Sequence, residues 1–221
     1  MLFIMKHPPF ANNEFYHIYN RGVDRRKIFS DQYDLRRFFQ SMDEFNVSEP
    51  IGSIYESSFL DQSVLLKRKK KRLVSFIAYC LNPNHIHFVI QQVREGGVSE
   101  LMKRLFGGYT WYFNKKYNRS GSLFQGTFKA KHVDSNEYLL HLSAYVNLNY
   151  HAHQLGGLTA KLCKSSWDEF IDSGTGGFCN KNIILEQFRS SREYKQFAES
   201  SLKDIAERKN RDKEFCEILL E

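Results

Sequence analysis

The stretch RLVSFIAYCLNPNHIHFVIQQ, residues 72–92, contains two apolar runs separated by an Asn-Pro-Asn turn signal. Both runs are rich in β-branched and aromatic residues, so the stretch predicts a β-hairpin. In the second predicted strand, from His85 to Gln92, the side-chain period of two places His85 and His87 on one face. The side chains on the other face, predicted to lie on the core, are Ile86, Phe88 and Ile90.

Elements on both sides of the hairpin complete an α+β pattern. In chain order we expect a strand at 14–22, a helix capped by Ser30 or Asp31, the hairpin, a long helix from Gly97 to about Tyr117, a short strand at 126–133 and a helix ending near Tyr150. Asp134 and Glu137 are expected to form the capping box of the last helix. This β-α-β-β-α-β-α order fits a ferredoxin-like antiparallel sheet with packed helices.

The chain is expected to contain one main domain, residues 10–155, followed by an appendage at 156–221. Beyond Gly156 the composition becomes loop-like, and from about residue 181 it is charged and helical. A length of 221 residues with 42% hydrophobic side chains is enough to bury a sizeable core.

The composition argues against membrane and disulfide-rich classes. No apolar run approaches the roughly 18 residues that a membrane span needs, and the first ten residues do not form a signal peptide, so we expect a cytoplasmic protein with no membrane partner. The four cysteines lack C-x-x-C spacing, which argues against a zinc knuckle or a disulfide framework.

The positive charge is concentrated in one segment. The formal net charge is +7, and residues 101–133 hold seven basic side chains without a single Asp or Glu. Aromatic side chains are interleaved with them, a pattern that suits phosphates and unstacked bases, although each single ring is more commonly part of a core. The seven basic residues are Lys103, Arg104, Lys115, Lys116, Arg119, Lys129 and Lys131. A second basic run at 67–72 could be a solvated loop or a supporting nucleic-acid contact.

Two interpretations of the histidine pair follow from its chemistry. Two imidazoles on one strand face can ligate a divalent ion, but strand histidines are commonly structural. In the last predicted helix, Tyr145 and Asn149 lie four residues apart and so on one stripe. A tyrosine hydroxyl can attack phosphorus and an amide oxygen can ligate a hard metal, whereas the alternative is ordinary packing near a helix end.

Four ordered motifs closely resemble the REP-associated tyrosine transposases, members of the HUH single-strand transposases with a single catalytic tyrosine. The motifs are YHIYNRG, YCLNPNHIHFVI, LMKRLFGGYTWYFNKKYNRSGSLFQGTFKAKHV and YLLHLSAYVNLN, and the resemblance covers about residues 10–153. It implies that His85 and His87 are metal ligands, that Tyr145 is the nucleophile and that Asn149 is the third ligand. The chain has Asn82 where the family usually has Met, and Tyr150 where the family usually has Pro.

The resemblance implies a metal-dependent transposase that uses Mg²⁺ or Mn²⁺. Such an enzyme cleaves and rejoins single-stranded DNA at hairpin repeats through a 5′-phosphotyrosine intermediate, as a monomer or a homodimer. The seven basic residues would then contact the DNA, together with Arg21, Arg25 and Gln125. The alternative is a non-catalytic single-stranded DNA- or RNA-binding protein derived from such a transposase. A third class, the two-histidine phosphodiesterases, needs a second H-x-T/S motif and is less favoured.

Overall fold

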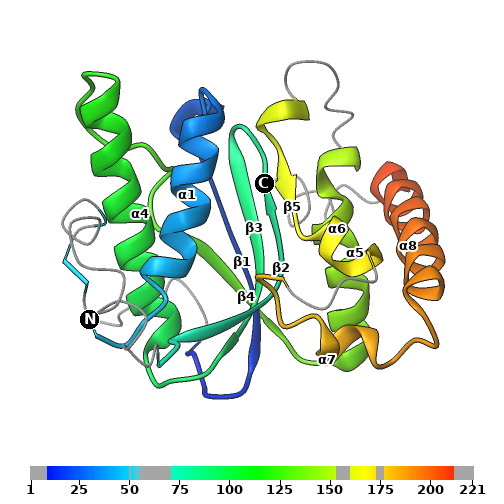
Figure 1. Cartoon of the computed structure of the whole chain (residues 1–221). Coiled ribbons are helices and arrows are strands. Elements are labelled where there is room, and N and C mark those ends of the chain that lie inside the picture. The colour runs from blue at the N-terminus through cyan, green and yellow to red at the C-terminus, as the bar shows by residue number, and fades with distance from the viewer. Residues whose placement is uncertain are drawn as a thin grey trace, which may run out of the picture.

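The computed structural model describes residues 9–49, 51–52, 54, 71–152, 160–172 and 177–211. Its centre is an antiparallel five-stranded sheet in the order β4-β1-β3-β2-β5 (Figure 1). The strands are β1 Phe15–Arg21, β2 Val74–Leu81, β3 His85–Gln92, β4 Lys129–Val133 and β5 Lys164–Ser165. The first four strands have the ferredoxin-like arrangement, and the α+β prediction is confirmed.

Helices cover both faces of the sheet (Figure 1). The helices on one face are α1 Gln32–Glu44 and α4 Gly97–Lys116. The helices on the other face are α5 Asn136–Ala152, α6 Trp167–Ile171 and α8 Ser191–Arg211. The short elements are the 3-10 turns η1 Val23–Arg25 and η2 Ala160–Leu162 and the helix α7 Asn182–Leu185. The predicted β-α-β-β-α-β-α order is therefore confirmed, and further elements follow it.

The core between the sheet and the α1–α4 pair uses the predicted apolar face of β3. The side chains of Ile86, Phe88 and Ile90 are fully buried in this core. Val89, on the opposite face of β3, belongs to a second core with α5. The period of two thus separates the faces as predicted, and it turns the histidines of β3 toward α5.

The N-terminal caps of α1 and α5 were both predicted from the sequence, and only the cap of α1 is the predicted one. Asp31 caps α1 in a full capping box, with Asp34 N–H donating to Asp31 Oδ1 at 2.9 Å. The expected capping box of Asp134 and Glu137 is wrong, because Ser135 Oγ accepts from the N–H of Tyr138 at 3.2 Å. Since α5 begins at Asn136, Glu137 is the second residue of the helix rather than the third, and the box spacing is lost.

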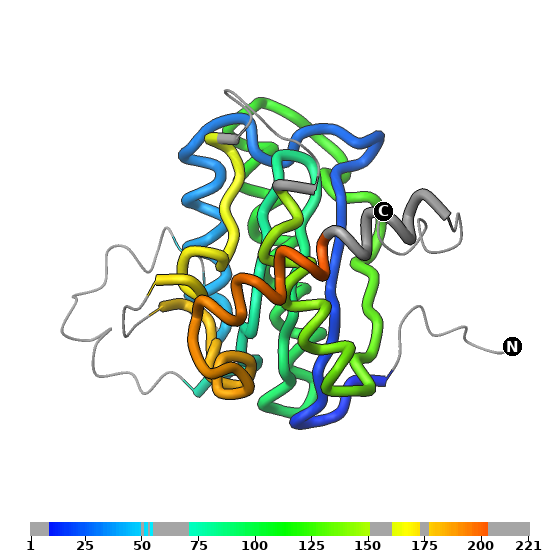
Figure 2. The backbone as a smooth tube through the Cα atoms, turned by 90° about the vertical axis from the view of Figure 1, so that its right-hand side faces the viewer, coloured from blue at the N-terminus to red at the C-terminus, as the bar shows by residue number. Residues whose placement is uncertain are grey.

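The C-terminal part contributes to the sheet and to the second core. The expected loop after Gly156 is wrong at β5, where Lys164 and Ser165 pair with Leu81 and Cys80 of β2. The predicted charged C-terminal helix is confirmed as α8, which lies against the outer side of α5 (Figure 2). The apolar side chains that pack around α5 from this part include Trp167, Phe170, Ile184, Tyr194 and Ala198. The division at residue 155 stays a prediction.

Among the described helices, none is long and apolar enough to cross a membrane. Residues 67–70 of the second basic run lie outside the described residues.

Candidate active site

The strand β3 holds the two predicted ligands on the face that α5 covers. His87 is 2% exposed and His85 is half-buried at the start of the strand. Their ring centroids are 5.2 Å apart and the ring planes are nearly perpendicular. Two imidazoles of one strand therefore converge on a single region of the surface of the sheet.

The helix α5 places the other two predicted residues against this pair. The ring of Tyr145 lies edge-on to that of His87, with the centroids 5.7 Å apart. Asn149, one turn further along the helix, has its Oδ1 3.2 Å from Nε2 of His85. The structure thus brings together all four residues that the motifs singled out.

Hydrogen bonds define the tautomer of His85. The side-chain amide nitrogen of Asn82 lies 2.8 Å from His85 Nε2, and an amide NH₂ group can only donate. His85 therefore carries its proton on Nδ1, which lies 2.7 Å from Asn84 Oδ1. Its Nε2 lone pair consequently accepts from the Asn82 amide, whose Nδ2 also donates to Asn149 Oδ1, 3.2 Å from this nitrogen.

The donor set fits a divalent cation. Ligands at right angles around Mg²⁺, at about 2.1 Å from the ion, are about 3 Å apart, close to the 3.2 Å between His85 Nε2 and Asn149 Oδ1. Within the described residues, the buried Nδ2 atom of Asn149 has no hydrogen-bond partner that meets the usual distance and angle limits. Asn82 Nδ2 donates to that oxygen at 2.6 Å, so cation binding requires the Asn82 amide to turn away. Among the described residues, no group of three or more His, Cys, Asp or Glu could hold a metal ion.

The hydroxyl of Tyr145 is in an environment that opposes its ionisation. The residue is 4% exposed, and burial raises the pKa of its hydroxyl well above the ordinary value. A side-chain hydrogen bond with Asn149 acts in the opposite direction and lowers this pKa. Asn149 therefore contacts both the tyrosine and His85.

A third histidine, which the sequence analysis did not single out, belongs to the same cluster. His17 of β1 is 1% exposed, and its Nε2 lies 3.0 Å from Nδ1 of His87. Burial, helped by the positive charge of Lys131, lowers the pKa of His17 to about 3, so its ring is neutral at physiological pH. The available signal was the alternation in YHIYN, which places His17 and Tyr19 on one face of a strand.

A small pocket adjoins the histidines at the end of β1. It has a volume of about 130 Å³ and is lined by Tyr19, Asn20, Arg21, Gln125 and Lys129. The ring of Tyr19 stacks on that of His87, with the centroids 5.9 Å apart. The side chain of Arg21 donates a hydrogen bond to Gln125, so two predicted DNA contacts are paired at this pocket.

The other predicted DNA-binding residues divide into separate groups. Lys129 and Lys131 are exposed on β4, opposite Tyr19 and His17 of β1, and so lie near the histidine cluster. Lys115 and Lys116 are the last two residues of α4, and Arg119 follows three residues later.

Three predicted contacts lie elsewhere. Lys103 is exposed in the first half of α4, about 18 Å along the helix axis from Lys115. Arg104 bonds Glu100 Oε1 at 2.7 Å and the carbonyl of Val47 at 2.6 Å. Arg25 is exposed in η1. The seven basic residues therefore do not form one continuous surface.

The sequence holds one H-x-S triplet, His141–Ser143 in α5, and its polar groups serve packing. His141 Nδ1 lies 3.0 Å from Ser201 Oγ of α8. Ser143 Oγ donates to the carbonyl of Leu140 and lies 3.1 Å from the hydroxyl of Tyr194. Both side chains join α5 to α8, which does not favour the two-histidine phosphodiesterase class.

The fold and the site together define an HUH-type protein, in which a His–hydrophobic–His strand faces a helix that carries a tyrosine. The family model described as "Transposase IS200 like" matches residues 11–149, more than half of the 221-residue chain. The chain belongs to this family of IS200-like transposases, and the resemblance seen in the four motifs is confirmed.

One solved structure with a similar fold is a REP-associated tyrosine transposase bound to a REP hairpin. It shares 11% sequence identity with the chain and has a TM-score of 0.49. The match covers 78% of this chain and 87% of that one. None of the curated proteins compared with the chain matches it.

Proposed function

We propose that this protein is a metal-dependent transposase that cleaves and rejoins single-stranded DNA at hairpins, with Tyr145 as the nucleophile. One observation supports this proposal above the others: the Tyr145–Asn149 stripe of α5 lies directly on the histidine pair of β3. Asn149 Oδ1 is 3.2 Å from His85 Nε2, and the rings of Tyr145 and His87 are 5.7 Å apart.

The reaction is a transesterification. The Tyr145 oxygen attacks the scissile phosphorus and loses its proton, a new O–P bond forms, and the bond from phosphorus to the 3′-oxygen breaks. The products are a 5′-phosphotyrosine and a DNA end whose 3′-oxygen takes up a proton. A second 3′-hydroxyl attacks the phosphotyrosine in the same way and restores the tyrosine, so the exchange needs no ATP.

His85, His87 and Asn149 would hold the cation. His85 offers its Nε2 lone pair, because Asn84 accepts its Nδ1 proton. His87 offers Nε2 if its Nδ1 proton is donated to His17, 3.0 Å away. A bound Mg²⁺ or Mn²⁺ would polarise the scissile phosphate and favour the ionised form of Tyr145.

The basic edge beside the site suits the DNA backbone. Lys129 and Lys131 on β4 and Arg21 on β1 lie on the same face of the sheet as the histidines, around the pocket at Tyr19. Phosphate contacts of this kind supply most of the salt-dependent affinity of single-strand binding proteins.

A non-catalytic binding protein remains the second candidate because Tyr145 is only 4% exposed. In that case the basic edge would bind DNA or RNA and the tyrosine would be a packing residue. The two candidates differ in one product, the covalent protein–DNA adduct.

The test is a denaturing gel of full-length protein incubated with Mn²⁺ or Mg²⁺ and labelled hairpins from repeats flanking its own gene. We expect a protein–DNA adduct that EDTA removes and that neither Tyr145→Phe nor His87→Ala forms. Tyr150→Phe, which alters the half-buried tyrosine one turn later, is the matched control and should retain the adduct. Binding of the hairpin without an adduct under either metal would favour the binding protein.

A further inference from the structure

One aromatic side chain of the basic segment differs from the others in its exposure. Most of the aromatic rings between residues 101 and 133 pack in or against the core under α1 and α4. This agrees with the expectation that a single ring in this segment is more commonly part of a core. Trp111 instead is 67% exposed, on the outer side of α4. A large exposed aromatic ring in a folded protein commonly indicates a binding surface.

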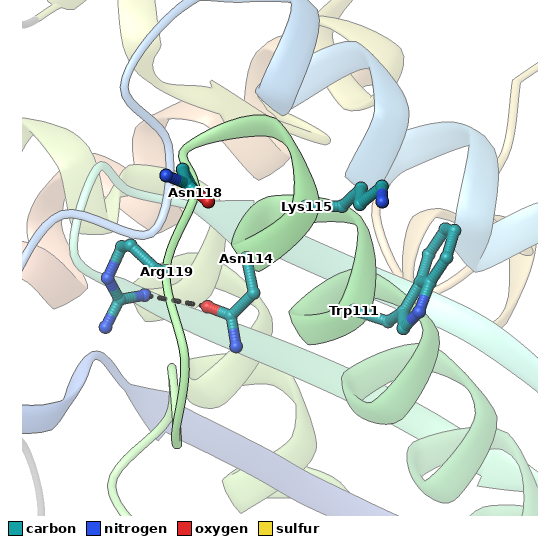
Figure 3. Close-up of a pocket in the computed structure, with 5 residues that line it drawn as sticks. All are labelled: Trp111, Asn114, Lys115, Asn118 and Arg119. Carbon is teal, nitrogen blue, oxygen red and sulfur yellow. Dashed lines mark hydrogen bonds between the residues drawn. The ribbon is translucent and has the colours of Figure 1, made fainter.

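Trp111 forms one wall of an open cavity of about 340 Å³ at the C-terminal end of α4 (Figure 3). The other lining residues are Asn114, Lys115, Asn118 and Arg119. Trp111 and Lys115 are one helical turn apart, so the indole and the ammonium group lie on the same side of α4. Arg119 donates to Asn114 Oδ1 at 3.0 Å, and Asn114 Nδ2 donates to the carbonyl of Gly121 at 2.8 Å. These two bonds hold the guanidinium at the edge of the cavity.

The charge around the cavity is positive. Its lining contains two basic side chains and no acidic one. Asp31 and Asp34, at the start of α1, both bind Lys116 at 2.7 Å, which offsets one of their two negative charges, and none of these three residues is in the lining. An exposed aromatic ring in a lining that also holds two cations suits a nucleobase with its flanking phosphates.

The cavity is connected to the histidine site through the fold. The hydroxyl of Tyr109 on α4 donates to the carbonyl of Ile28 at 2.6 Å, and the N–H of Ile28 donates to the carbonyl of Pro83 at 2.7 Å, two residues before His85. Arg119 of this cavity and Gln125 of the pocket at Tyr19 are six residues apart, so their backbones are at most about 22 Å apart and one oligonucleotide can reach both pockets.

We propose that this cavity is a stacking site for an unpaired base of the DNA hairpin, with Trp111 as the stacking platform and Lys115 and Arg119 as phosphate contacts. The inference rests on the proposed function for the identity of the DNA. It adds a base-binding site, separate from Tyr145, on the opposite face of the sheet.

Tryptophan fluorescence tests the stacking directly. The chain has two tryptophans, and Trp167 is only 7% exposed in the second core. The probe is a hairpin with an unpaired thymidine tail, compared with the same hairpin whose tail is abasic. We expect saturable quenching of Trp111 with the first and much weaker quenching with the second, in the wild type and in Trp167→Phe. Equal quenching by both, or none while the hairpin binds, would overturn the proposal.

Two matched variants measure the contribution to affinity. Trp111→Ala should weaken binding of the thymidine-tailed hairpin by about 5-fold or more, the effect of losing one base stack. Tyr33→Ala removes another exposed aromatic, 70% exposed and outside the cavity, and should leave the affinity unchanged. Equal affinities for Trp111→Ala and the wild type would contradict the stacking site.

The two proposals fail in different experiments. If the wild type forms a metal-dependent adduct but Trp111→Ala binds like the wild type, the stacking site is wrong and the transposase stands. If Trp111 is quenched by the thymidine tail but no metal yields an adduct, the stacking site stands and the catalytic proposal is wrong.

Discussion

Two neighbouring lysines at the end of α4 have the same chemistry and different surroundings. Lys116 Nζ lies 2.7 Å from Asp34 Oδ1, and the side chain of Asp34 is fully buried. Lys115 is exposed and lines the cavity beside Trp111. A basic residue in a predicted DNA-binding segment can therefore serve the fold, the ligand or both.

We predict that Lys116→Met lowers the free energy of unfolding by about 2 kcal/mol. This is less than the 3–5 kcal/mol typical of a broken, fully buried pair, because Lys116 is 28% exposed and the hydroxyls of Tyr112 and Tyr117 still contact Asp34. Lys115→Met should change stability by less than about 0.5 kcal/mol. Urea unfolding of both variants measures the difference, and equal losses would contradict this assignment.

The same pair of variants separates binding from stability. Lys115→Met should weaken hairpin binding and reduce the salt dependence of the affinity by about one released counterion. A salt titration of the affinity checks this, with Lys103→Met as a control on the same helix. A change of the same size in Lys103→Met would show that the effect does not belong to the cavity.

At the residue scale, the sequence predicted which side chains lie together when they belong to the same strand or the same helix. The period of two brought His85 and His87 to one face, and the four-residue spacing brought Tyr145 and Asn149 to one stripe. His17 was missed because its role depends on the pairing of β1 with β3. Trp111 could not be separated from the core aromatics, since helical spacing alone does not show which ring remains exposed.

Among the elements, α4 contains a Gly107–Gly108 pair in the middle of a helix of 20 residues. A Cβ at Gly108 would lie 3.0 Å from the ring of Phe45, the residue that ends α1, so the glycine permits close approach of the two helices. Apart from the backbone of α4 itself, a Cβ at Gly107 would meet no atom of the described residues within 4 Å. Packing against α1 therefore explains a glycine at position 108 but not at position 107.

We predict that Gly107→Ala raises the free energy of unfolding by up to about 1 kcal/mol, the difference in helix propensity between the two residues. Gly108→Ala should gain less or lose stability, because the Phe45 ring must move. Thermal unfolding of the two variants compares them under one condition. A larger gain for Gly108→Ala would show that the α1–α4 contact is looser than described.

The sequence predicted long elements better than short ones. The hairpin and α4 have periods that extend over eight or more residues, whereas β5 has two residues, Lys164 and Ser165, and no period to detect. The start of α5 was misplaced by one residue because both Asp134 and Ser135 are good capping residues. The packing of α5 in the folded protein, which the sequence does not show, determines that Ser135 rather than Asp134 is the capping residue.

For the molecule as a whole, α5 lies between the sheet and the C-terminal helices. Ser166, before α6, hydrogen-bonds Asn147 of α5 and accepts from the N–H of Tyr79 of β2 at 2.9 Å. Tyr194 of α8 is fully buried and accepts from Asn147 Nδ2 at 2.9 Å. These contacts connect the helix that carries Tyr145 to the part of the chain that was predicted to be an appendage.

We predict that a chain ending at residue 155 is much less stable than the full chain. Loss of Tyr194 alone corresponds to about 3–5 kcal/mol for a large buried side chain, and Trp167 and Phe170 would be lost with it. Urea unfolding of the truncated and full chains tests this. Equal midpoints would support residues 10–155 as an independent domain.

The most direct test of the central claim is to map the covalent bond. Full-length protein is incubated with hairpin DNA and Mn²⁺ and digested with a protease and a nuclease, and the nucleotide-bearing peptide is sequenced by mass spectrometry. The account predicts a phosphotyrosine linkage at Tyr145, absent when EDTA is present. A linkage at any other residue, or none while the hairpin binds, would contradict it.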